Sequence, residues 1–368
     1  MNPGSFLFAS LSRRRPPTGP LLRHLWLDVK GLRLHCLAAG SRGQQVVLLH
    51  GGGLDAAGLS FRYTIPFLAE RYRVFAPDWP GFGESAAMPH GWRVEECVEF
   101  VADLFDVLGL ERATLIGLSM GGAFALGFAL HAPGRVERLV LVDSVGLGGG
   151  IPGGLLSYLA LHLPFVDELR WSVSIRIPAL VRRSLCAPLL NQTEIALEEA
   201  LDDIVRVARK AGAGAAFRQL QRSEYQWLGL RTNYLDRLSK IQVPTLIVHG
   251  LEDRLIPVSC AQCAHRLIPH SQLEVIPRCG HLPPVEQPQF FNRIVDSFLQ
   301  NHLRLAENPG VRQQRFRAAL ERVSEFMKGR ILGQSASVAH RMDRSPGDDK
   351  PPRLTRVSRA PARNALNQ

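Results

Sequence analysis

Gly117-Leu118-Ser119-Met120-Gly121 is the stretch of this 368-residue chain that decides its fold. It follows an apolar, β-branched run at 113–116 and precedes an Ala-, Leu- and Phe-rich segment that extends to residue 130. This order predicts a strand, a sharp turn and a helix, with a serine at the apex of the turn. The two outer glycines leave room for a tight bend, and the helix start directs free N–H groups toward a ligand. The pattern therefore predicts a nucleophilic Ser119 whose hydroxyl stands clear of the backbone.

A serine hydroxyl is a weak nucleophile at neutral pH. This interpretation therefore requires a general base, an acid that orients the base, and hydrogen-bond donors for an oxyanion. Suitable residues follow three other apolar runs. These are Val46–Leu49 with His50-Gly51-Gly52-Gly53, 243–248 with His249-Gly250-Leu251-Glu252-Asp253, and 273–276 with His281. The chain order Ser, Asp, His at successive strand ends is the order expected of α/β-hydrolases.

From about Leu25 to Leu303 the chain resembles the serine α/β-hydrolases. Besides these motifs, Asp78-Trp79-Pro80-Gly81-Phe82-Gly83-Glu84-Ser85 is similar to the turn after the fourth strand in that family. The combination of His-Gly-Gly-Gly with Ser-Met-Gly-Gly most resembles the branch of the meta-cleavage-product hydrolases, which break carbon–carbon bonds, and related esterases. The resemblance implies an α/β fold with a mostly parallel central sheet flanked by helices. It also implies a helical cap inserted after the sixth strand.

The same resemblance assigns roles to particular residues. Ser119, Asp253 and His281 correspond to the catalytic triad, and the amides of Gly52 and Met120 correspond to the oxyanion hole. Four further positions are expected to bind substrate: Gly51, Gly53, Leu118 and Leu282. The chain departs from the carbon–carbon hydrolases at two of these. They usually carry Asn where this chain has Leu118, and Trp where it has Leu282, so we expect the chemistry to transfer but not the substrate.

Asp143 is an alternative for the triad acid, because it ends the apolar run 139–142 and some family members place the acid there. The segment Gly250–Pro257 matches the family's acid loop more fully, which favours Asp253. The side chain of Glu252 is expected to point away. Among the other histidines, we expect His50 to brace its loop by hydrogen bonding. Structural or surface positions are expected for His131, His249 and His265.

The hydrophobic pattern divides the chain into a hydrolase domain at 24–302 and two basic extensions, 1–23 and 303–368. Strands alternate with helices up to about residue 146, which is typical of a parallel sheet. Strand signals are absent from about 147 to 232, and this region is interpreted as the cap. The helices expected in and after the cap are Leu155–Val166, Thr193–Ala211, Ala215–Leu228 and Pro288–Leu303. The apolar side chains within 155–165 either line an acyl pocket or pack the cap on the body.

The net charge of +11 is concentrated at the two ends of the chain. Residues 304–368 contain fourteen Lys and Arg against six Asp and Glu, whereas residues 34–303 have a net charge of −2. Helical spacing at about 311–332 predicts an amphipathic helix, and the sequence beyond it is typical of disorder. No recognised nucleic-acid-binding module accompanies the basic tail, so we expect no nucleic-acid partner. The tail could contact a membrane surface or a second subunit in a homo-oligomer, but docking on the protein itself is favoured.

The six cysteines are scattered and suggest no disulfide framework, which favours a reducing, cytoplasmic location. No cluster of Cys, His and Asp has the spacing of a metal site, so neither a metal nor a cofactor is expected. The sequence predicts a hydrolase that acts on a small ester-like or other acyl substrate through an acyl-enzyme. The alternatives are a carbon–carbon bond hydrolase and a non-catalytic ligand receptor built on a hydrolase scaffold.

Overall fold

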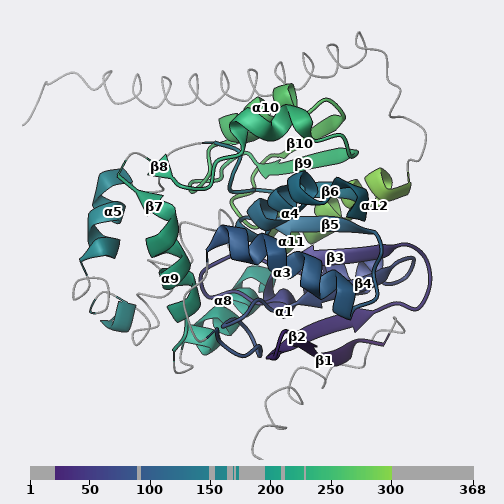
Figure 1. The fold of residues 1–368 in the computed structure, drawn as a ribbon, viewed down its shortest axis with the longest axis horizontal. Coiled ribbons are helices and arrows are strands. Elements are labelled where there is room, and N and C mark those ends of the chain that lie inside the picture. The colour runs from purple at the N-terminus through teal and green to yellow at the C-terminus, as the bar shows by residue number, and fades with distance from the viewer. Residues whose placement is uncertain are drawn as a thin grey trace, which may run out of the picture. The chain divides into compact units, whose positions relative to one another are not determined.

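Eight strands form one sheet in the order β1-β2-β4-β3-β5-β6-β9-β10 (Figure 1). The computed structural model describes residues 21–88, 93–148, 154–163, 169, 171–173, 195–208, 212–227 and 229–300. The strands are β1 (Arg23–Val29), β2 (Leu32–Ala39), β3 (Gln45–Leu49), β4 (Arg73–Pro77), β5 (Ala113–Leu118), β6 (Val136–Val142), β9 (Thr245–Gly250) and β10 (Ser271–Ile276).

The sheet is antiparallel at one edge and parallel elsewhere. Strand β2 pairs antiparallel with both β1 and β4, and every pair from β4 to β10 is parallel. The hairpin between β1 and β2 turns at Lys30 and Gly31, both with positive φ, as a tight two-residue turn requires. The predicted mostly parallel sheet is therefore confirmed. Because parallel strands run in one direction, the carboxyl ends of β3, β5, β6, β9 and β10 share one edge of the sheet.

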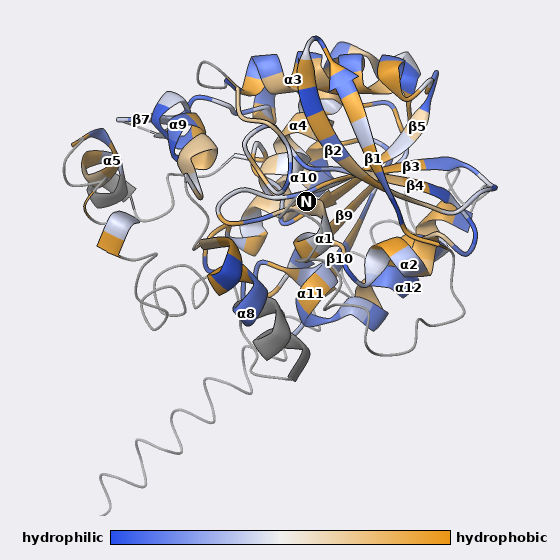
Figure 2. Ribbon diagram, turned by 90° about the horizontal axis from the view of Figure 1, so that it is seen from below, coloured by the Kyte–Doolittle hydropathy of each residue, from blue (hydrophilic) through white to orange (hydrophobic). Residues whose placement is uncertain are grey.

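Helices cover both faces of this sheet, and each face has its own apolar cluster. One cluster includes residues of α3 (Val94–Val107), α4 (Met120–His131) and α10 (Val258–Leu267). The other includes residues of α1 (Ala57–Ser60), α2 (Thr64–Leu68) and α12 (Pro288–Gln300). Figure 2 shows the central strands as hydrophobic and the helices as mixed, with polar outer faces. All six residues of β5 are buried, as expected for a strand covered on both faces.

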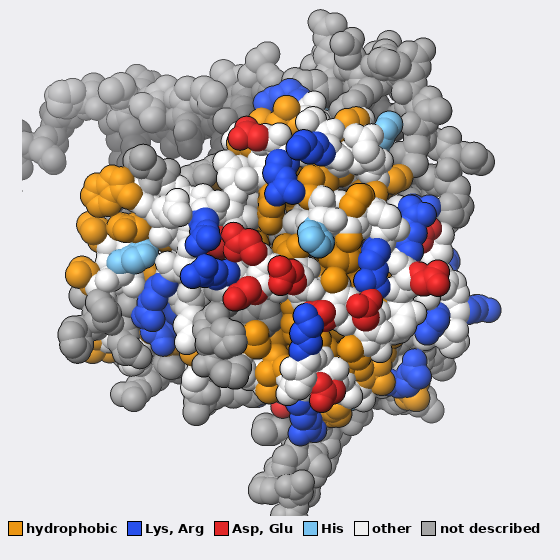
Figure 3. Space-filling view, in the orientation of Figure 1, with side chains coloured by type: hydrophobic (Ala, Val, Ile, Leu, Met, Phe, Trp, Pro, Cys, Tyr) orange, Lys and Arg blue, Asp and Glu red, His pale blue; other side chains and the backbone are white. Residues whose placement is uncertain are grey.

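Three shorter elements connect or extend these layers. They are the 3₁₀ helices η3 (Pro133–Arg135) and η5 (Leu235–Lys240), and the single-turn helix α11 (Pro283–Glu286), which precedes α12. On the face viewed in Figure 3, basic and acidic side chains are interspersed over the described part of the surface.

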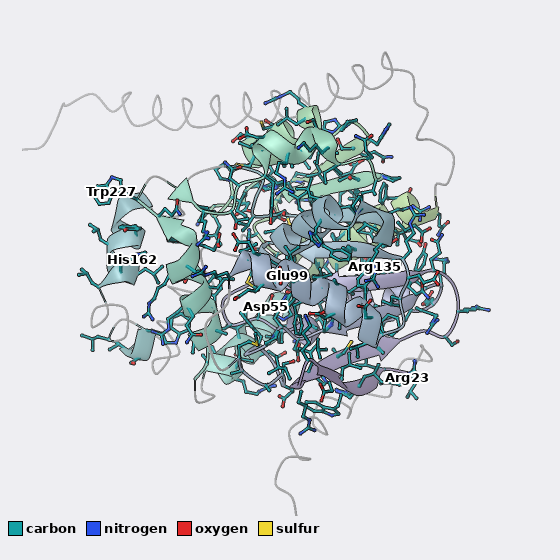
Figure 4. All side chains as sticks on the ribbon, in the orientation of Figure 1. Arg23, Asp55, Glu99, Arg135, His162 and Trp227 are labelled. Atoms are coloured by element: carbon teal, nitrogen blue, oxygen red, sulfur yellow. The ribbon has the colours of Figure 1, made fainter. Side chains whose placement is uncertain are left out.

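The cap elements lie in the chain between β6 and β9. They are α5 (Gly154–His162), α8 (Ile195–Ala208), α9 (Ala215–Glu224) and the hairpin strands β7 (Tyr225–Gln226) and β8 (Gly229–Leu230). Helices therefore occur in all three predicted cap segments. The hairpin was not predicted, because two-residue strands are too short to show an alternating pattern. Trp227 and His162 are the labelled cap side chains in Figure 4, and Tyr158 of α5 stacks on His162 and meets Trp227 edge-on.

Helix α9 is amphipathic and buries Ala216, Leu220 and Glu224, which are four residues apart along one side. An ion pair between Arg62 and Asp203 links α8 to the body just after α1. The predicted helix at about 311–332, the basic tail beyond it and most of the N-terminal extension lie outside the described residues. Within the described residues, no helix is both long and apolar enough to cross a membrane.

Candidate active site

Ser119 lies at the turn between β5 and α4 in a backbone conformation that non-glycine residues rarely adopt. Its φ is 52° and its ψ is −115°. Its N–H donates to the carbonyl of Val142 at 2.8 Å, which ties the turn to β6. A Cβ on Gly121 would approach the carbonyl oxygen of His50 to 2.6 Å, so only glycine fits at this position. The predicted tight turn is confirmed, and it leaves the Ser119 side chain half-buried at the sheet edge.

His281 brings the hydroxyl of Ser119 and the carboxylate of Asp253 into one hydrogen-bonded chain. Its Nε2 is 2.9 Å from Oγ of Ser119, and its Nδ1 is 2.7 Å from Oδ2 of Asp253. A carboxylate only accepts, so Nδ1 carries the proton and Nε2 is free to accept from the serine hydroxyl. The side chain of Asp253 is fully buried and that of His281 is 4% exposed. The structure therefore places the three predicted triad residues within hydrogen-bond distance, although 162 positions separate Ser119 and His281.

Three N–H groups surround the carboxylate of Asp253. Its Oδ1 accepts from the backbone N–H groups of Leu255 and Ile256 at 2.7 and 3.0 Å, and its Oδ2 accepts from His281. Burial alone would raise the pKa of this carboxyl. The hydrogen bond and charge of His281, with the Ile256 N–H, outweigh burial and hold the pKa of Asp253 below its usual range. Asp253 is therefore ionised at neutral pH.

Asp143 lies beside this chain, not within it. It follows β6, has a φ of 41°, and is completely buried. Its Oδ1 accepts the Gly250 N–H at 3.0 Å and is 3.4 Å from Nε2 of His249. Burial, and then the charge of Asp253, raise the pKa of the Asp143 carboxyl well above its usual range. It is Asp253, and not the alternative Asp143, that hydrogen-bonds to His281.

The N–H groups of Gly52 and Met120 are the predicted oxyanion donors. Met120 is the first residue of α4, where N–H groups lack acceptors within the helix. In the part of the chain that the structure describes, neither N–H donates to a protein acceptor. Gly51 precedes Gly52 in the same loop, and a Cβ on Gly51 would lie 3.5 Å from Cβ of Ser119. The glycine loop therefore lies directly beside the serine. Both amides are thus available near the candidate nucleophile.

The loop that carries Gly52 is braced from behind by polar side chains. His50 bonds the carbonyl of Gly51 through Nδ1 at 2.8 Å and accepts the N–H of Trp79 at Nε2, so its predicted bracing role is confirmed. Asp55, labelled in Figure 4, accepts the Gly51 N–H at 2.8 Å and the Ser60 hydroxyl at 2.6 Å. These contacts hold the loop through Gly51 and leave the Gly52 amide free.

Two carboxylates, to which the sequence assigned no such role, hold the segment around His281. Glu286, on α11, accepts the N–H groups of Gly280 and Leu282, which flank the histidine. Glu252, next to Asp253, accepts the Cys279 N–H at 2.9 Å. Its side chain points away from the imidazole, as predicted, but it has a positioning contact that was missed. The spacing of the motifs does not predict these hydrogen bonds from backbone N–H groups to carboxylates. The bond to Glu252 depends on how close the loop after β9 lies to the loop after β10.

Asp143, His249 and Asp253 also form a group whose potential metal-ligand atoms lie within 4.8 Å of one another. Two of these atoms already have partners. Oδ2 of Asp253 receives the His281 N–H, and Nε2 of His249 is 2.9 Å from the carbonyl of Ile256. A cation at this position would compete with His281 for Asp253. The group therefore fits a hydrogen-bonded acid cluster better than a metal centre.

Comparison with known proteins agrees with this geometry. Residues 45–288 match the alpha/beta hydrolase fold family. This chain is an α/β-hydrolase. A 2-hydroxy-6-oxo-2,4-heptadienoate hydrolase from Pseudomonas putida is 33% identical over 270 residues, which cover 72% of this chain and 91% of that protein.

Two solved structures extend the comparison. A meta-cleavage product hydrolase from Pseudomonas fluorescens has a TM-score of 0.60 at 27% identity, covering 76% of this α/β-hydrolase and 98% of that chain. A thermophilic esterase from Thermogutta terrifontis has a TM-score of 0.61, also at 27% identity, with the same two coverages. The predicted family and its branch, which contains both kinds of hydrolase, are therefore confirmed.

Cap helix α9 covers the glycine loop in this α/β-hydrolase. The ring of Phe217 lies directly against Gly52, in the space where a Cβ would be. Next to it, a small apolar cavity of about 10 Å³ lies between α9 and the body. Its lining residues are Trp79, Pro80, Phe82, Cys97, Met120, Phe124, Ala216 and Leu220. The cap therefore contributes apolar side chains directly beside the candidate oxyanion donors.

The four positions predicted to bind substrate differ in accessibility. Gly51 is buried and Gly53, with a φ of 82°, is half-buried in the glycine loop. Leu118 is completely buried in the apolar cluster on the α12 side, and Leu282 is partly buried against the same cluster. In the cap, Leu159 and Leu163 are 40% and 53% exposed and do not line the cavity beside Met120. The substrate-binding roles of the four positions remain predictions.

Proposed function

We propose that this α/β-hydrolase is a serine hydrolase that cleaves an ester-like or other acyl substrate through an acyl-enzyme. Ser119 is the nucleophile, His281 the general base and Asp253 the acid that orients the imidazole. The observation that supports this proposal most is the continuous chain from Oγ of Ser119 through His281 to Asp253, with separations of 2.9 and 2.7 Å. Such a chain lets a weak nucleophile lose its proton as it attacks.

In the proposed mechanism, Nε2 of His281 takes the Ser119 proton as Oγ attacks the substrate carbonyl. The N–H groups of Gly52 and Met120 donate to the oxyanion that forms. His281 then returns the proton to the leaving group, and the acyl group stays on Ser119. Water, deprotonated by His281, then attacks the acyl carbonyl, and His281 passes that proton to Oγ of Ser119 as the acyl–oxygen bond breaks and the acid product leaves. Losing one oxyanion donor in such a site typically lowers kcat by about 10²- to 10³-fold.

The apolar lining of the small cavity beside Met120 supports a substrate with an uncharged acyl portion. None of the eight residues that line it carries a charge at neutral pH. Arg62, which follows α1, is already paired with Asp203, so its positive charge is compensated. Burying a carboxylate without a partner is strongly unfavourable. An apolar acyl chain therefore fits the described part of the site better than an acidic one.

A carbon–carbon bond hydrolase is the second candidate, and the similar proteins favour it. The Pseudomonas putida relative and one from Burkholderia cepacia, both 33% identical, are named for dienoate substrates. The same serine, base and oxyanion donors could serve such a substrate, which is a vinylogous diketone with a carboxylate. The apolar Leu118 and Leu282 weigh against it, because neither side chain can hydrogen-bond that polar portion.

Purified enzyme assayed on p-nitrophenyl esters of increasing chain length and on a 2-hydroxy-6-oxo dienoate separates the two candidates. We expect higher kcat/KM on an ester, and a higher value on the dienoate would reverse the assignment. Ser119→Ala should lose about 10⁶-fold in kcat, as removal of a serine nucleophile does elsewhere. The exposed Ser239 offers a matched control, and Ser239→Ala should retain full activity.

A fluorophosphonate probe tests the third alternative, a non-catalytic ligand receptor. We expect covalent labelling of the native protein and of Ser239→Ala, but not of Ser119→Ala. Folded native protein that remains unlabelled would favour the receptor. The small-molecule partner, the possible oligomer and the cytoplasmic location stay predictions from the sequence.

A further inference from the structure

We propose that Asp143 is a neutral carboxylic acid that donates its proton to Asp253, and so positions the acid of the triad. The inference rests on the proposed function, because it assigns a positioning role within the same site. The two aspartates follow neighbouring parallel strands, β6 and β9. The N–H of Asp143 donates to the carbonyl of Val248 at 3.0 Å, which anchors Asp143 at the end of β9.

The two carboxyl groups are close enough to interact directly. Ligand atoms of the two side chains lie within 4.8 Å of one another, and the Asp143 carboxyl is completely buried. Two negative charges this close in a buried site repel each other strongly, and two ionised carboxylates could only accept hydrogen bonds. This arrangement favours a proton on one of the pair. Buried carboxyl pairs at this separation titrate as a unit that releases its second proton with difficulty.

The number of surrounding donors decides which carboxyl keeps the proton. Asp253 accepts three N–H groups, from Leu255, Ile256 and His281. Asp143 accepts one, from Gly250, and its Oδ2 has no hydrogen-bond partner although it is completely buried. Protonation turns this otherwise unsatisfied oxygen into a donor toward Asp253. The charge therefore resides on Asp253 and the proton on Asp143.

The other titratable groups around Asp143 do not compensate a second negative charge. Burial, then the charge of Asp253 and last that of Glu286 raise the pKa of its carboxyl. The Cys279 thiol, whose pKa is itself raised by burial, stays neutral. His249 is completely buried, and burial lowers its pKa, so it is neutral as well. His281 is the remaining candidate cation among the described groups, and it is bonded to Asp253.

A donated proton has two consequences for Asp253. It helps to hold the carboxylate in one orientation, with Oδ2 toward His281. The N–H groups of Leu255 and Ile256 hold the same orientation by donating to Oδ1. It also withdraws part of the negative charge that His281 experiences. The imidazolium is then stabilised less, and the acidic limb of the pH profile of kcat/KM lies at lower pH than it would without Asp143.

The backbone at Asp143 limits which substitutions are informative. With a φ of 41°, most side chains would be strained, whereas asparagine and glycine tolerate this conformation. Asp143→Asn supplies a neutral N–H donor to Asp253 and keeps an acceptor for the Gly250 N–H. Asp143→Gly removes the donor without straining the backbone. Asp143→Gly also removes the acceptor of the Gly250 N–H, so the two variants differ in that bond as well as in the contact that the proposal concerns.

The first experiment compares the pH profiles of kcat/KM on the best p-nitrophenyl ester. In Asp143→Gly we expect the acidic limb to move up by about half a pH unit or more, because Asp253 regains its full charge. In Asp143→Asn the limb should stay in place, with kcat/KM within about threefold of native. A limb that moves down in Asp143→Asn would show that Asp143 is ionised. An unmoved limb in Asp143→Gly with a lowered Tm would show a purely structural role, and either result overturns the proposal.

The second experiment needs no activity and keeps the inference separate from the proposed function. The infrared spectrum of native protein at neutral pH should contain the carbonyl-stretching band of a protonated carboxylic acid. Subtracting the spectrum of Asp143→Asn from that of the native protein separates this band from any band of Glu224. The separation is needed because burial also raises the pKa of the Glu224 carboxyl. Absence of the band from the difference spectrum overturns the proposal. Its presence in a protein that hydrolyses no acyl substrate would instead refute the proposed function alone.

Discussion

The body of this α/β-hydrolase contributes the polar groups of the candidate site, whereas the described part of the cap contributes apolar ones. The serine, the histidine and both aspartates follow strands of the sheet, and carboxylates brace the loops between them. Cap helix α9 places Phe217 against the glycine loop and Leu220 in the adjoining cavity. Under the proposed function, this difference implies that bond breaking depends on the sheet edge and that the choice of substrate depends on the cap.

The largest effect should come from the body. Asp253→Asn keeps the shape of the side chain but loses the carboxylate that accepts the Nδ1 proton of His281. We expect kcat to fall about 10⁴-fold, as in other triads with this substitution, with little change in KM. Steady-state kinetics on a short ester provide the measurement. Asp143→Asn is the matched comparison, and loss of activity there with retention in Asp253→Asn would reverse the two assignments.

The junction between body and cap should be next in sensitivity. A methyl group on Gly52 would enter the space of the Phe217 ring. We expect Gly52→Ala to lower kcat/KM by about 10²-fold, because the loop shifts and misplaces one oxyanion donor. In a Phe217→Ala background, where the ring is removed, Gly52→Ala should lower kcat/KM by less than about tenfold.

The control for this double-mutant cycle is Gly134→Ala, because nothing lies within 4 Å of a Cβ at that position. It should leave kcat/KM unchanged. Equal losses from Gly52→Ala with and without Phe217 would mean that the cap does not press on the loop.

The two aspartates should have opposite effects on stability as pH changes. The pKa of Asp253 is lowered in the folded protein, so its contribution is present above about pH 4 and is lost as pH falls through the folded pKa. The pKa of Asp143 is raised, so its folded form binds a proton that the unfolded chain has released. Stability is therefore lost as pH rises from about 4 toward the folded pKa of Asp143.

Urea unfolding of native protein and Asp143→Asn at pH 5, 6 and 7 measures this difference. As pH rises, the free energy of unfolding of the variant should increase relative to that of the native protein by about 1.4 kcal/mol per pH unit. A difference that stays constant with pH would mean that Asp143 is ionised in the folded state as well.

The smallest catalytic effect should come from the cap. Leu220 is 6% exposed and lines the cavity, so Leu220→Ala should enlarge it and lower the free energy of unfolding by about 2 kcal/mol. We expect kcat on a short ester to change less than threefold, while the preferred acyl chain becomes longer. Leu159→Ala, at an exposed cap position, is the control and should change neither property. A large loss of kcat on short esters in Leu220→Ala would place the cap in the chemistry.

The sequence predicted the triad geometry because each member follows an apolar strand, and parallel strands bring their ends to one edge. The turn at Ser119 and the loop at His50 contain glycines whose need for close approach can be read directly. The bonds from Glu252 and Glu286 to the segment around His281 could not be predicted, since they depend on the separation of two loops. The same holds for Phe217 on Gly52, because helical periodicity tells which residues of α9 share a side but not what they meet.

The structure of the enzyme after reaction with a fluorophosphonate tests the central claim most directly. We expect phosphorus bonded to Oγ of Ser119 and one phosphoryl oxygen about 2.7–3.1 Å from the nitrogens of both Gly52 and Met120. His281 should remain hydrogen-bonded to Asp253 in that adduct. An adduct on another residue, or a phosphoryl oxygen directed away from both amides, would contradict the account.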